Sequence, residues 1–181
     1  MRIIAGTARS RRLVGPPGDT TRPMTDRVRE SLFSSVAAWV PDSVVLDLYA
    51  GTGSMGLEAL SRGAATVTFV ERDRQALAAL RTNIEAVGLG GTVVAGDVDA
   101  YLDRASGPVD LAFVDPPYAV TLPSLVETMQ KLAPLLAEGA LAIVHRRAGE
   151  EPPGQIADLE IADERGYGSA VLWRYAKEQS W

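Results

Sequence analysis

Between about residue 43 and residue 147, stretches of consecutive apolar residues alternate with stretches whose apolar residues recur every three or four positions. The first kind predicts strands buried on both faces, and the second predicts amphipathic helices. The expected strands span residues 43–49, 65–71, 92–97, 109–117 and 139–147, and the expected helices span residues 54–63, 73–88, 98–105 and 122–136. Because strands and helices alternate over short loops, we predict an α/β fold whose parallel sheet is covered on both faces.

The N-terminal region has a different pattern. Residues 1–6 and 11–15 are short apolar runs on either side of a polar turn, which predicts a small β-hairpin. Residues 16–23 are rich in Pro, Gly and Thr and predict a loop. We therefore divide the chain into an N-terminal arm, residues 1–24, and a single larger domain, residues 25–181.

Two more elements flank the alternating part of the domain. Residues 25–40 place apolar side chains at helical spacing behind Thr25, a favourable N-cap, and predict a helix that stops before Pro41. Residues 158–176 predict two strands joined by a turn that contains glycine. We expect these two strands to form an antiparallel pair at one edge of the sheet.

Composition limits the chemistry that the chain can carry. With 181 residues, 46% of them hydrophobic, the chain fits one domain with a sizeable core. It has no cysteine, which excludes disulfides and thiolate metal sites, and a single histidine, His145, which excludes a multi-histidine metal centre. Because the sequence has neither a signal peptide nor an apolar run of about 18 residues, we expect a cytoplasmic protein that binds no metal and no membrane.

Charge is distributed unevenly along the chain. The net charge of −5 argues against a nucleic-acid partner. However, residues 1–30 contain seven arginines against three acidic residues, a balance of +4, whereas the rest carries 11 basic and 20 acidic side chains, a balance of −9. The arginines are Arg2, Arg9, Arg11, Arg12, Arg22, Arg27 and Arg29. This asymmetry indicates that a polyanion docks at the N-terminal end of the molecule.

Acidic residues follow each of the first four expected strands. They are Asp47, Glu71, Asp97 and Asp115. Open parallel sheets bind their ligands outside the carboxyl ends of the strands, so we expect these four side chains to line one crevice. An acidic residue after a strand is often only a helix cap, but four at corresponding places indicate a site.

A glycine-rich loop follows the first strand of this series, with Gly51, Gly53 and Gly56 spaced as G-x-G-x-x-G before a helix. Such a loop can hold a dinucleotide or S-adenosylmethionine, or it can be a turn that binds nothing. Two like charges about 4 Å apart cost about 4 kcal/mol at an effective dielectric of about 20, so a ring of carboxylates disfavours a pyrophosphate. It favours the cationic sulfonium and ammonium of S-adenosylmethionine. Glu71 then suits the ribose hydroxyls and Asp97 the adenine amine.

The segment FVDPPY, residues 113–118, ends the fourth expected strand. Two prolines stiffen its backbone and remove two N–H donors. The Asp115 carboxylate and the Pro116 carbonyl can accept the two hydrogens of an exocyclic amine, and Tyr118 offers a flat face on which a base can stack. This arrangement predicts methyl transfer to the nitrogen of a planar substrate by positioning and electrostatic support.

The motifs DLYAGTGSMG, FVERD, AGDV and FVDPPY, in this order, resemble those of class I S-adenosylmethionine methyltransferases that act on exocyclic or amide nitrogens. The N-terminal segments MRIIAGTARSRRL and TRPMTDRVRESLF closely resemble the RsmD family. This resemblance implies methylation of N2 of one guanine in bacterial 16S ribosomal RNA, within the small ribosomal subunit or an assembly intermediate.

The resemblance also implies a Rossmann-like sheet of seven strands, mostly parallel, with the last strand antiparallel, in a protein that we expect to be a monomer. The implied cofactor-binding residues are Thr25, Asp47, Gly51, Gly53, Gly56, Glu71, Arg72, Asp97, Val98 and Asp115, the catalytic ones are Asp115, Pro116 and Tyr118, and the seven N-terminal arginines bind RNA. One departure concerns the segment VHRR, residues 144–147, where family members often have an acidic residue. We therefore assign no role to His145, Arg146 or Arg147.

Three other functions share some of these features. An adenine-N6 nucleic-acid methyltransferase uses the same chemistry, but the DNA-directed enzymes usually add a target-recognition region, for which this chain has no large insertion. A methyltransferase of protein glutamine normally has Asn at position 115. A noncatalytic RNA-binding assembly factor would have no need of the acidic crevice and the DPPY segment together.

Overall fold

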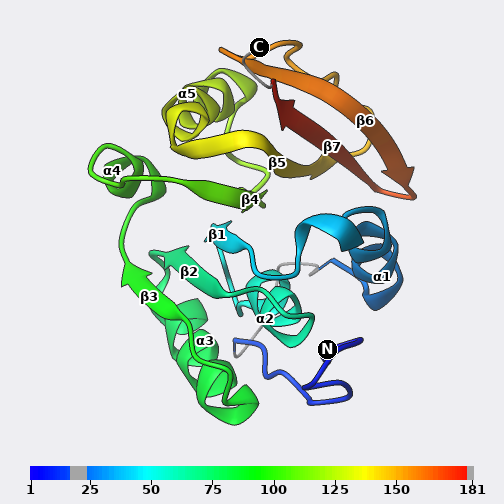
Figure 1. Cartoon of the computed structure of the whole chain (residues 1–181), viewed down its shortest axis with the longest axis vertical. Helices are drawn as coiled ribbons and strands as arrows, with labels where there is room; N and C mark the ends of the chain where they lie inside the picture. The colour runs from blue at the N-terminus through cyan, green and yellow to red at the C-terminus, as the bar shows by residue number, and fades with distance from the viewer. Residues whose placement is uncertain (17–23, 179–181) are drawn as a thin grey trace.

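A computed structural model describes residues 1–16 and 24–178 and contains one seven-stranded sheet. The strands are β1 (Val44–Leu48), β2 (Thr66–Glu71), β3 (Thr92–Ala95), β4 (Val109–Val114), β5 (Leu136–Arg147), β6 (Leu159–Tyr167) and β7 (Ala170–Lys177). Their order in the sheet is β3-β2-β1-β4-β5-β7-β6 (Figure 1). The first five strands pair in parallel, and β7 runs antiparallel to both of its neighbours. The predicted sheet, with its antiparallel last strand, is confirmed.

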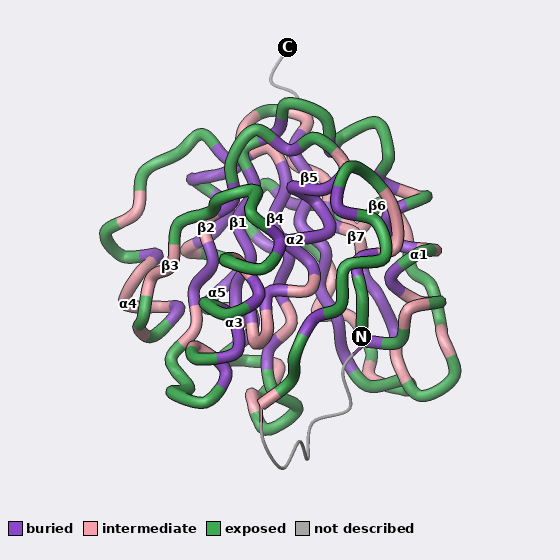
Figure 2. Tube along the Cα trace, turned by 90° about the horizontal axis from the view of Figure 1, so that it is seen from below, coloured by how far each residue is buried: buried purple, intermediate pink, exposed green. Residues whose placement is uncertain are grey.

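Helices cover both faces of this sheet. They are α1 (Asp26–Ser35), α2 (Ser54–Ser61), α3 (Arg74–Val87), α4 (Val98–Leu102) and α5 (Leu122–Leu132). Residues of α1, α2 and α3 share one hydrophobic core with Val45 of β1, whereas α4 and α5 share a second core with Leu46. Because side chains alternate along a strand, each buried strand contributes to both cores. Figure 2 shows β1, β4 and β5, in the middle of the sheet, as mostly buried, whereas the edge strands β3 and β6 are mostly intermediate or exposed.

The first helix is shorter than predicted. Instead of continuing to residue 40, α1 ends at Ser35, and a 3₁₀ turn (Ala37–Trp39) follows. The hydroxyls of Ser34 and Ser35 donate to the carbonyls of Glu30 and Leu32, at 2.9 and 2.7 Å. Serine side chains that bond the preceding turn in this way compete with the helical backbone and disfavour its continuation.

The N-terminal arm folds back on itself and packs against α2. The predicted hairpin has a single bridge, between Arg2 and Arg12, with the Ile3 amide donating to the Arg11 carbonyl at 2.9 Å. Ile3 is fully buried in the same core as α2. At the turn, Gly6 has φ +83°, and a Cβ there would lie 1.7 Å from the Ser61 carbonyl oxygen, so only glycine fits.

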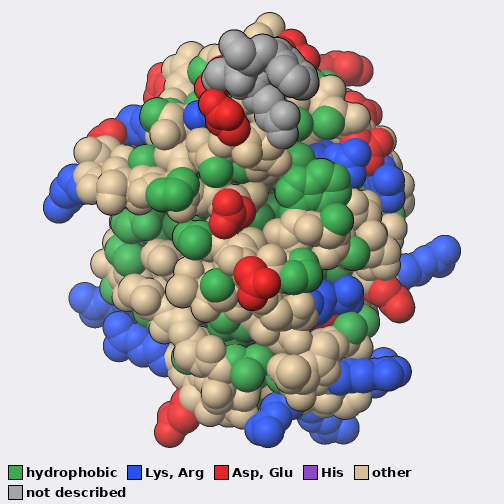
Figure 3. Space-filling model, in the orientation of Figure 1, with side chains coloured by type: hydrophobic (Ala, Val, Ile, Leu, Met, Phe, Trp, Pro, Cys, Tyr) green, Lys and Arg blue, Asp and Glu red, His purple; other side chains and the backbone are tan. Residues whose placement is uncertain are grey.

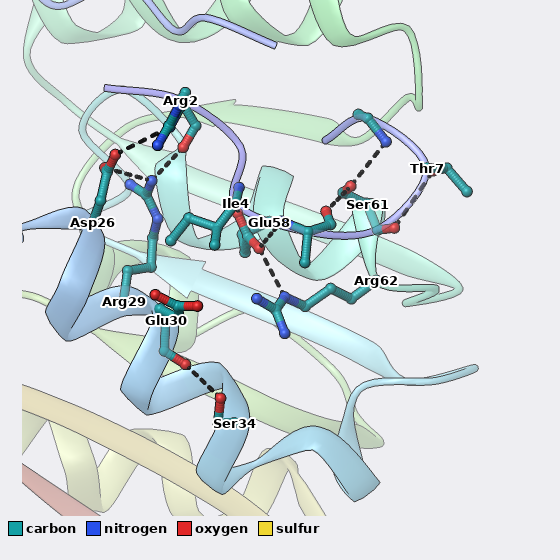
Figure 4. A network of polar contacts seen from close by, with 12 residues as sticks. Arg2, Ile4, Thr7, Asp26, Arg29, Glu30, Ser34, Glu58, Ser61 and Arg62 are labelled. Carbon is teal, nitrogen blue, oxygen red and sulfur yellow. Dashed lines mark hydrogen bonds and ion pairs between the residues drawn. The ribbon is translucent and has the colours of Figure 1, made fainter. Parts of the chain in front are cut away.

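Buried charges fasten the arm to the two neighbouring helices (Figure 4). Glu58 of α2 is fully buried and accepts from the amides of Ile4 and Ala5, at 2.7 and 3.0 Å, and from Arg62 Nε at 2.7 Å. On the other side, Arg29 of α1 donates to the Arg2 carbonyl. Polar side chains of both helices thus hold the arm. Its predicted boundary after residue 24 follows residues 17–23, which lie outside the described part of the chain.

Candidate active site

Backbone hydrogen bonds bring the loops that follow β1, β2, β3 and β4 together at one edge of the sheet. The Ala50 amide donates to the Val70 carbonyl at 3.0 Å, and the Gly96 amide donates to the Glu71 carbonyl at 2.9 Å. On the other side of β1, the Asp115 amide donates to the Leu48 carbonyl at 3.3 Å. The parallel register therefore gathers the predicted loops at the carboxyl edge, where such sheets bind ligands.

Carboxylates hold the glycine loop from two sides. Asp47 Oδ2 accepts the Gly56 amide, and Glu71 Oε2 accepts the Gly51 amide, both at 2.8 Å. Gly53 caps α2 in a left-handed conformation, with φ +79° and no side-chain cap. Helix geometry leaves the first N–H groups of α2 without partners in the helix. Asp47 accepts one of them, that of Gly56, whereas Gly53 at the N-cap offers no side chain.

The three glycines are required for different reasons. A Cβ on Gly53 would lie 2.4 Å from Leu80 Cδ1, and one on Gly56 would lie 2.4 Å from Phe69 Cε1. At Gly51, φ is +56° and the nearest atom to a Cβ would be 4.0 Å away. Gly53 and Gly56 thus allow the loop to pack on the core, whereas Gly51 has open space beside it.

Asp47 lies beneath the glycine loop and not at its surface. It is 2% exposed and points to the same side of β1 as Val45. Burial raises the pKa of the Asp47 carboxyl well above its ordinary range, although the hydrogen bond from Gly56 opposes this shift. Asp47 therefore shapes the loop from below.

The carboxylates after β2 and β3 are closer to the surface. Glu71 Oε1 accepts the amides of Arg72 and Asp73, at 2.8 and 2.7 Å. Asp97 caps α4, and its other oxygen lies 3.2 Å from Arg72 Nη1. Val98, the first residue of α4, is in contrast buried. Glu71, Arg72 and Asp97 form a connected polar rim on this side of the glycine loop.

The segment after β4 carries a second polar cluster, which we call the acceptor loop, residues 115–120. Asp115 has a 38% exposed side chain, and its Oδ1 lies 2.7 Å from Nδ1 of His145, at the end of β5. Pro116 is buried and Tyr118 is 44% exposed. The guanidinium of Arg147 lies over the Tyr118 ring, 4.9 Å from its centroid. An exposed carboxylate oxygen and an exposed aromatic ring thus lie in the same loop.

The predicted RNA-binding arginines fall into three groups. Arg2, Arg9, Arg11, Arg12 and Arg27 are exposed. Arg22 lies outside the described residues. Arg29 is 0% exposed, so the prediction that it binds RNA is wrong: its guanidinium is 3.0 Å from Asp26 Oδ1 and supports the arm. Burial lowers the pKa of Arg29, and Asp26 opposes that shift.

Basic side chains gather at the lower end of the molecule in Figure 3, where Figure 1 places the arm and α3. Arg11 Nη1 donates to the Ala86 carbonyl at the end of α3, at 2.7 Å.

Thr25, predicted to contact the cofactor, accepts the Val28 amide through its hydroxyl at 3.3 Å and caps α1. Its contact with a cofactor stays a prediction.

Sequence reasoning missed two polar residues of this region. His145 was given no role. The register Val114↔Val144 brings it level with Asp115, so pairing the ends of the fourth and fifth expected strands would have placed the two residues side by side. Asn83 of α3, 1% exposed, donates from Nδ2 to the carbonyls of Val14 and Thr52, both at 3.0 Å. Because it also accepts the Val14 amide at 2.8 Å, one side chain joins the arm to the glycine loop.

Two other kinds of feature do not occur in the described part of the chain. Among residues 1–16 and 24–178, no three His, Asp or Glu side chains are arranged to hold a metal ion. Within those same residues, no helix is long and apolar enough to cross a membrane.

Comparison with known proteins identifies the family. The model of the family described as Conserved hypothetical protein 95 matches residues 1–176. Ribosomal RNA small subunit methyltransferase D of Escherichia coli strain K12 is 36% identical over 98% of this chain and 90% of its own length. The solved structure of the Escherichia coli protein yhhF, described as a putative methyltransferase, has a TM-score of 0.88 at 37% identity over 99% of each chain. That of a hypothetical protein from Thermus thermophilus has a TM-score of 0.84 at 32% identity, over 96% of this chain and 98% of its own. The chain therefore belongs to the Conserved hypothetical protein 95 family, together with ribosomal RNA small subunit methyltransferase D.

Proposed function

We propose that this protein transfers a methyl group from S-adenosylmethionine to the exocyclic N2 of a guanine in 16S ribosomal RNA. The name of the Escherichia coli relative, ribosomal RNA small subunit methyltransferase D, supports small-subunit ribosomal RNA as the substrate. The observation that carries the proposal is the acceptor loop, whose exposed Asp115 and Tyr118 lie at the sheet edge that also holds the glycine loop. The choice of guanine rests on the sequence resemblance.

The loops at this edge fit S-adenosylmethionine, which supplies an electrophilic methyl group when bound. Open space beside Gly51 allows close approach to its backbone. The N-terminus of α2, where Gly53 offers no side-chain cap, suits an anionic group at its remaining N–H groups, and the rim of Glu71 and Asp97 suits hydroxyl and amine donors. The positive charge of Arg72 beside Asp97 offsets part of the negative charge of this rim.

The acceptor loop is suited to activating an amine. The nitrogen of an exocyclic amine is a poor nucleophile, because its lone pair is conjugated into the ring. Asp115 and the carbonyl of Pro116 accept its two hydrogens, which localises the lone pair and orients it for transfer. Tyr118 stacks on the base, and the Asp115 carboxylate is the first acceptor for the proton that the nitrogen loses after transfer.

The experiment is a methylation assay on small-subunit particles from a strain that lacks the corresponding enzyme. With tritiated S-adenosylmethionine, we expect label in small-subunit RNA, and digestion to nucleosides should release N2-methylguanosine. N6-methyladenosine would instead identify an adenine-directed enzyme. Cofactor binding without any transfer would contradict the proposed reaction and favour an assembly factor.

The exposed arginines of the arm are expected to dock the RNA. Replacing Arg9, Arg11 and Arg12 with glutamine removes up to three phosphate contacts, which should weaken RNA binding and lower the slope of log K against log salt by about 2 to 3. Binding to 16S RNA across a salt series measures both effects. The same replacement of Arg104 and Arg165, two exposed arginines outside the arm, is the control for loss of charge elsewhere. Equal salt slopes for the arm variant and the wild type would rule out the arm as the docking element.

A further inference from the structure

The last three residues of β5 each contact a different part of the acceptor loop. His145 Nδ1 is 2.7 Å from Asp115 Oδ1, at the start of the loop. Arg146 Nη2 donates to the Val120 carbonyl at 2.9 Å, at its end. Between them, Arg147 lies over the Tyr118 ring. The parallel pairing of β4 with β5 explains this arrangement, since both strands reach the same edge in register.

The hydrogen bond between His145 and Asp115 fixes which group donates the hydrogen and which carboxylate oxygen is occupied. An ionised carboxylate only accepts hydrogen bonds, so Nδ1 of His145 must carry the hydrogen and donate it. The histidine side chain is 8% exposed, which restricts its movement, whereas the Asp115 side chain is 38% exposed. One carboxylate oxygen is therefore held from the protein side, and the other is left for a ligand.

Arg146 ties the end of the acceptor loop to the body of the protein. Its side chain is 3% exposed, and besides Val120 it contacts Glu150, through Nε at 2.9 Å and Nη2 at 2.8 Å. A guanidinium that is buried and paired in this way has little freedom to change its position. The carbonyl of Val120 is consequently held at a fixed distance from β5.

Arg147 acts on the aromatic part of the loop. Its guanidinium covers one face of the Tyr118 ring, so that a base can stack only on the other face. Tyr118 is itself exposed, and the His145 ring lies 6.3 Å from it, at 56°. The three residues of β5 thus define where a carboxylate, an aromatic face and a backbone turn lie relative to one another.

We propose that His145, Arg146 and Arg147 are positioning residues of the acceptor loop, and that His145 sets the Asp115 carboxylate for the acceptor amine. This proposal deepens the proposed methyl transfer and rests on it for its kinetic consequences. The hydrogen bond from His145 selects the orientation of Asp115 before substrate arrives, which reduces the ordering needed in the transition state. Arg147 does the same for the stacking surface.

The kinetic test compares His145→Ala with His145→Asn, which restores a side-chain N–H donor on a shorter side chain. We expect His145→Ala to lower kcat by about 10- to 100-fold, the effect of losing a hydrogen bond to a charged group, with little change in KM for S-adenosylmethionine. His145→Asn should recover a large part of kcat. Equal kcat for His145→Ala and the wild type would overturn the proposal. So would no recovery in His145→Asn, or a loss of cofactor affinity equal to the loss of kcat.

Arg147 requires a different readout. Arg147→Ala should raise KM for the RNA several-fold, with a smaller effect on kcat, because the ring of Tyr118 loses its support. Arg147→Lys keeps the charge but loses the planar group that lies over the ring, so it should resemble Arg147→Ala if stacking is what matters. Wild-type KM in both variants would remove Arg147 from the proposal.

A spectroscopic test is independent of activity and separates the two proposals. Because His145 is the only histidine in the chain, protein labelled with ¹⁵N-histidine gives the signals of one ring. In the neutral ring, we expect the tautomer with hydrogen on Nδ1 in the wild type and its loss in Asp115→Ala. The opposite tautomer in the wild type would overturn the role of His145. The expected tautomer without methyl transfer would reject the proposed function alone.

Discussion

Replacing Asp115 with alanine is expected to reduce methyl transfer to small-subunit particles by at least about 100-fold, the effect of losing one electrostatic contact to a reacting group. Its carboxylate is the exposed acceptor of the acceptor loop, and removing it leaves the amine unoriented. Single-turnover rates with saturating cofactor measure the chemical step directly. We expect the protein to stay folded, because the Asp115 side chain is 38% exposed, although the loss of the partner of His145 costs about 1 to 3 kcal/mol.

Two controls make this result specific. Asp110→Ala removes another carboxylate of β4, one that accepts the Val44 amide at 2.8 Å at the opposite end of the strand, and should leave transfer intact. Calorimetry should show that Asp115→Ala still binds S-adenosylmethionine. Transfer at the wild-type rate in Asp115→Ala would reject the assignment of the acceptor loop.

Replacing Glu58 with alanine is expected to have the largest effect on stability, about 3 to 5 kcal/mol. The carboxylate is fully buried, so its loss leaves the amides of Ile4 and Ala5 and the guanidinium of Arg62 without their partner. Thermal unfolding should show a melting temperature lower by about 10 °C. Binding of RNA should weaken as well, because the arm is no longer held on α2.

Glu85→Ala is the matched control, since Glu85 is an exposed glutamate on α3. It should change the melting temperature by about 1 °C or less. Glu58→Gln keeps two polar groups of similar shape and should lie between the alanine variant and the wild type. If Glu58→Ala melted at the wild-type temperature, the arm would be held by its other contacts, among them the hydrogen bonds of Asn83 and Arg29.

The sheet and its binding edge could be predicted because they depend on patterns that the sequence displays directly. Apolar strands that alternate with amphipathic helices are compatible with few other folds. Because the strands are parallel, the acidic residues that follow them are expected at the same edge of the sheet. The length of α1 was harder, because Ser34 and Ser35 bond backward to the helix in a way that residue periodicity does not reveal.

The burial of Arg29 and Asp47 depends on contacts between distant segments. Arg29 lies on the same helical stripe as Leu32 and Phe33, so its position in the helix indicates a buried side chain, whereas its charge indicates an exposed one. In the fold, Asp26 and the Arg2 carbonyl both accept hydrogens from Nη2 of Arg29. Likewise, alternation along β1 places Asp47 with Val45 under α2, a consequence visible only once the faces of the sheet are assigned.

The hydrogen bonds of Asn83 have a consequence for the order in which the chain folds during synthesis. They join residues 69 and 31 positions apart, and Arg11 reaches Ala86 across 75 positions. Contacts that close loops of this length form late in folding. The conformational entropy of the loop is lost before the contacts that compensate for this loss have formed. The arm leaves the ribosome before α3, yet it cannot reach its final place until α3 has been made. The arm is therefore translated before α3 but is fixed in position only after it.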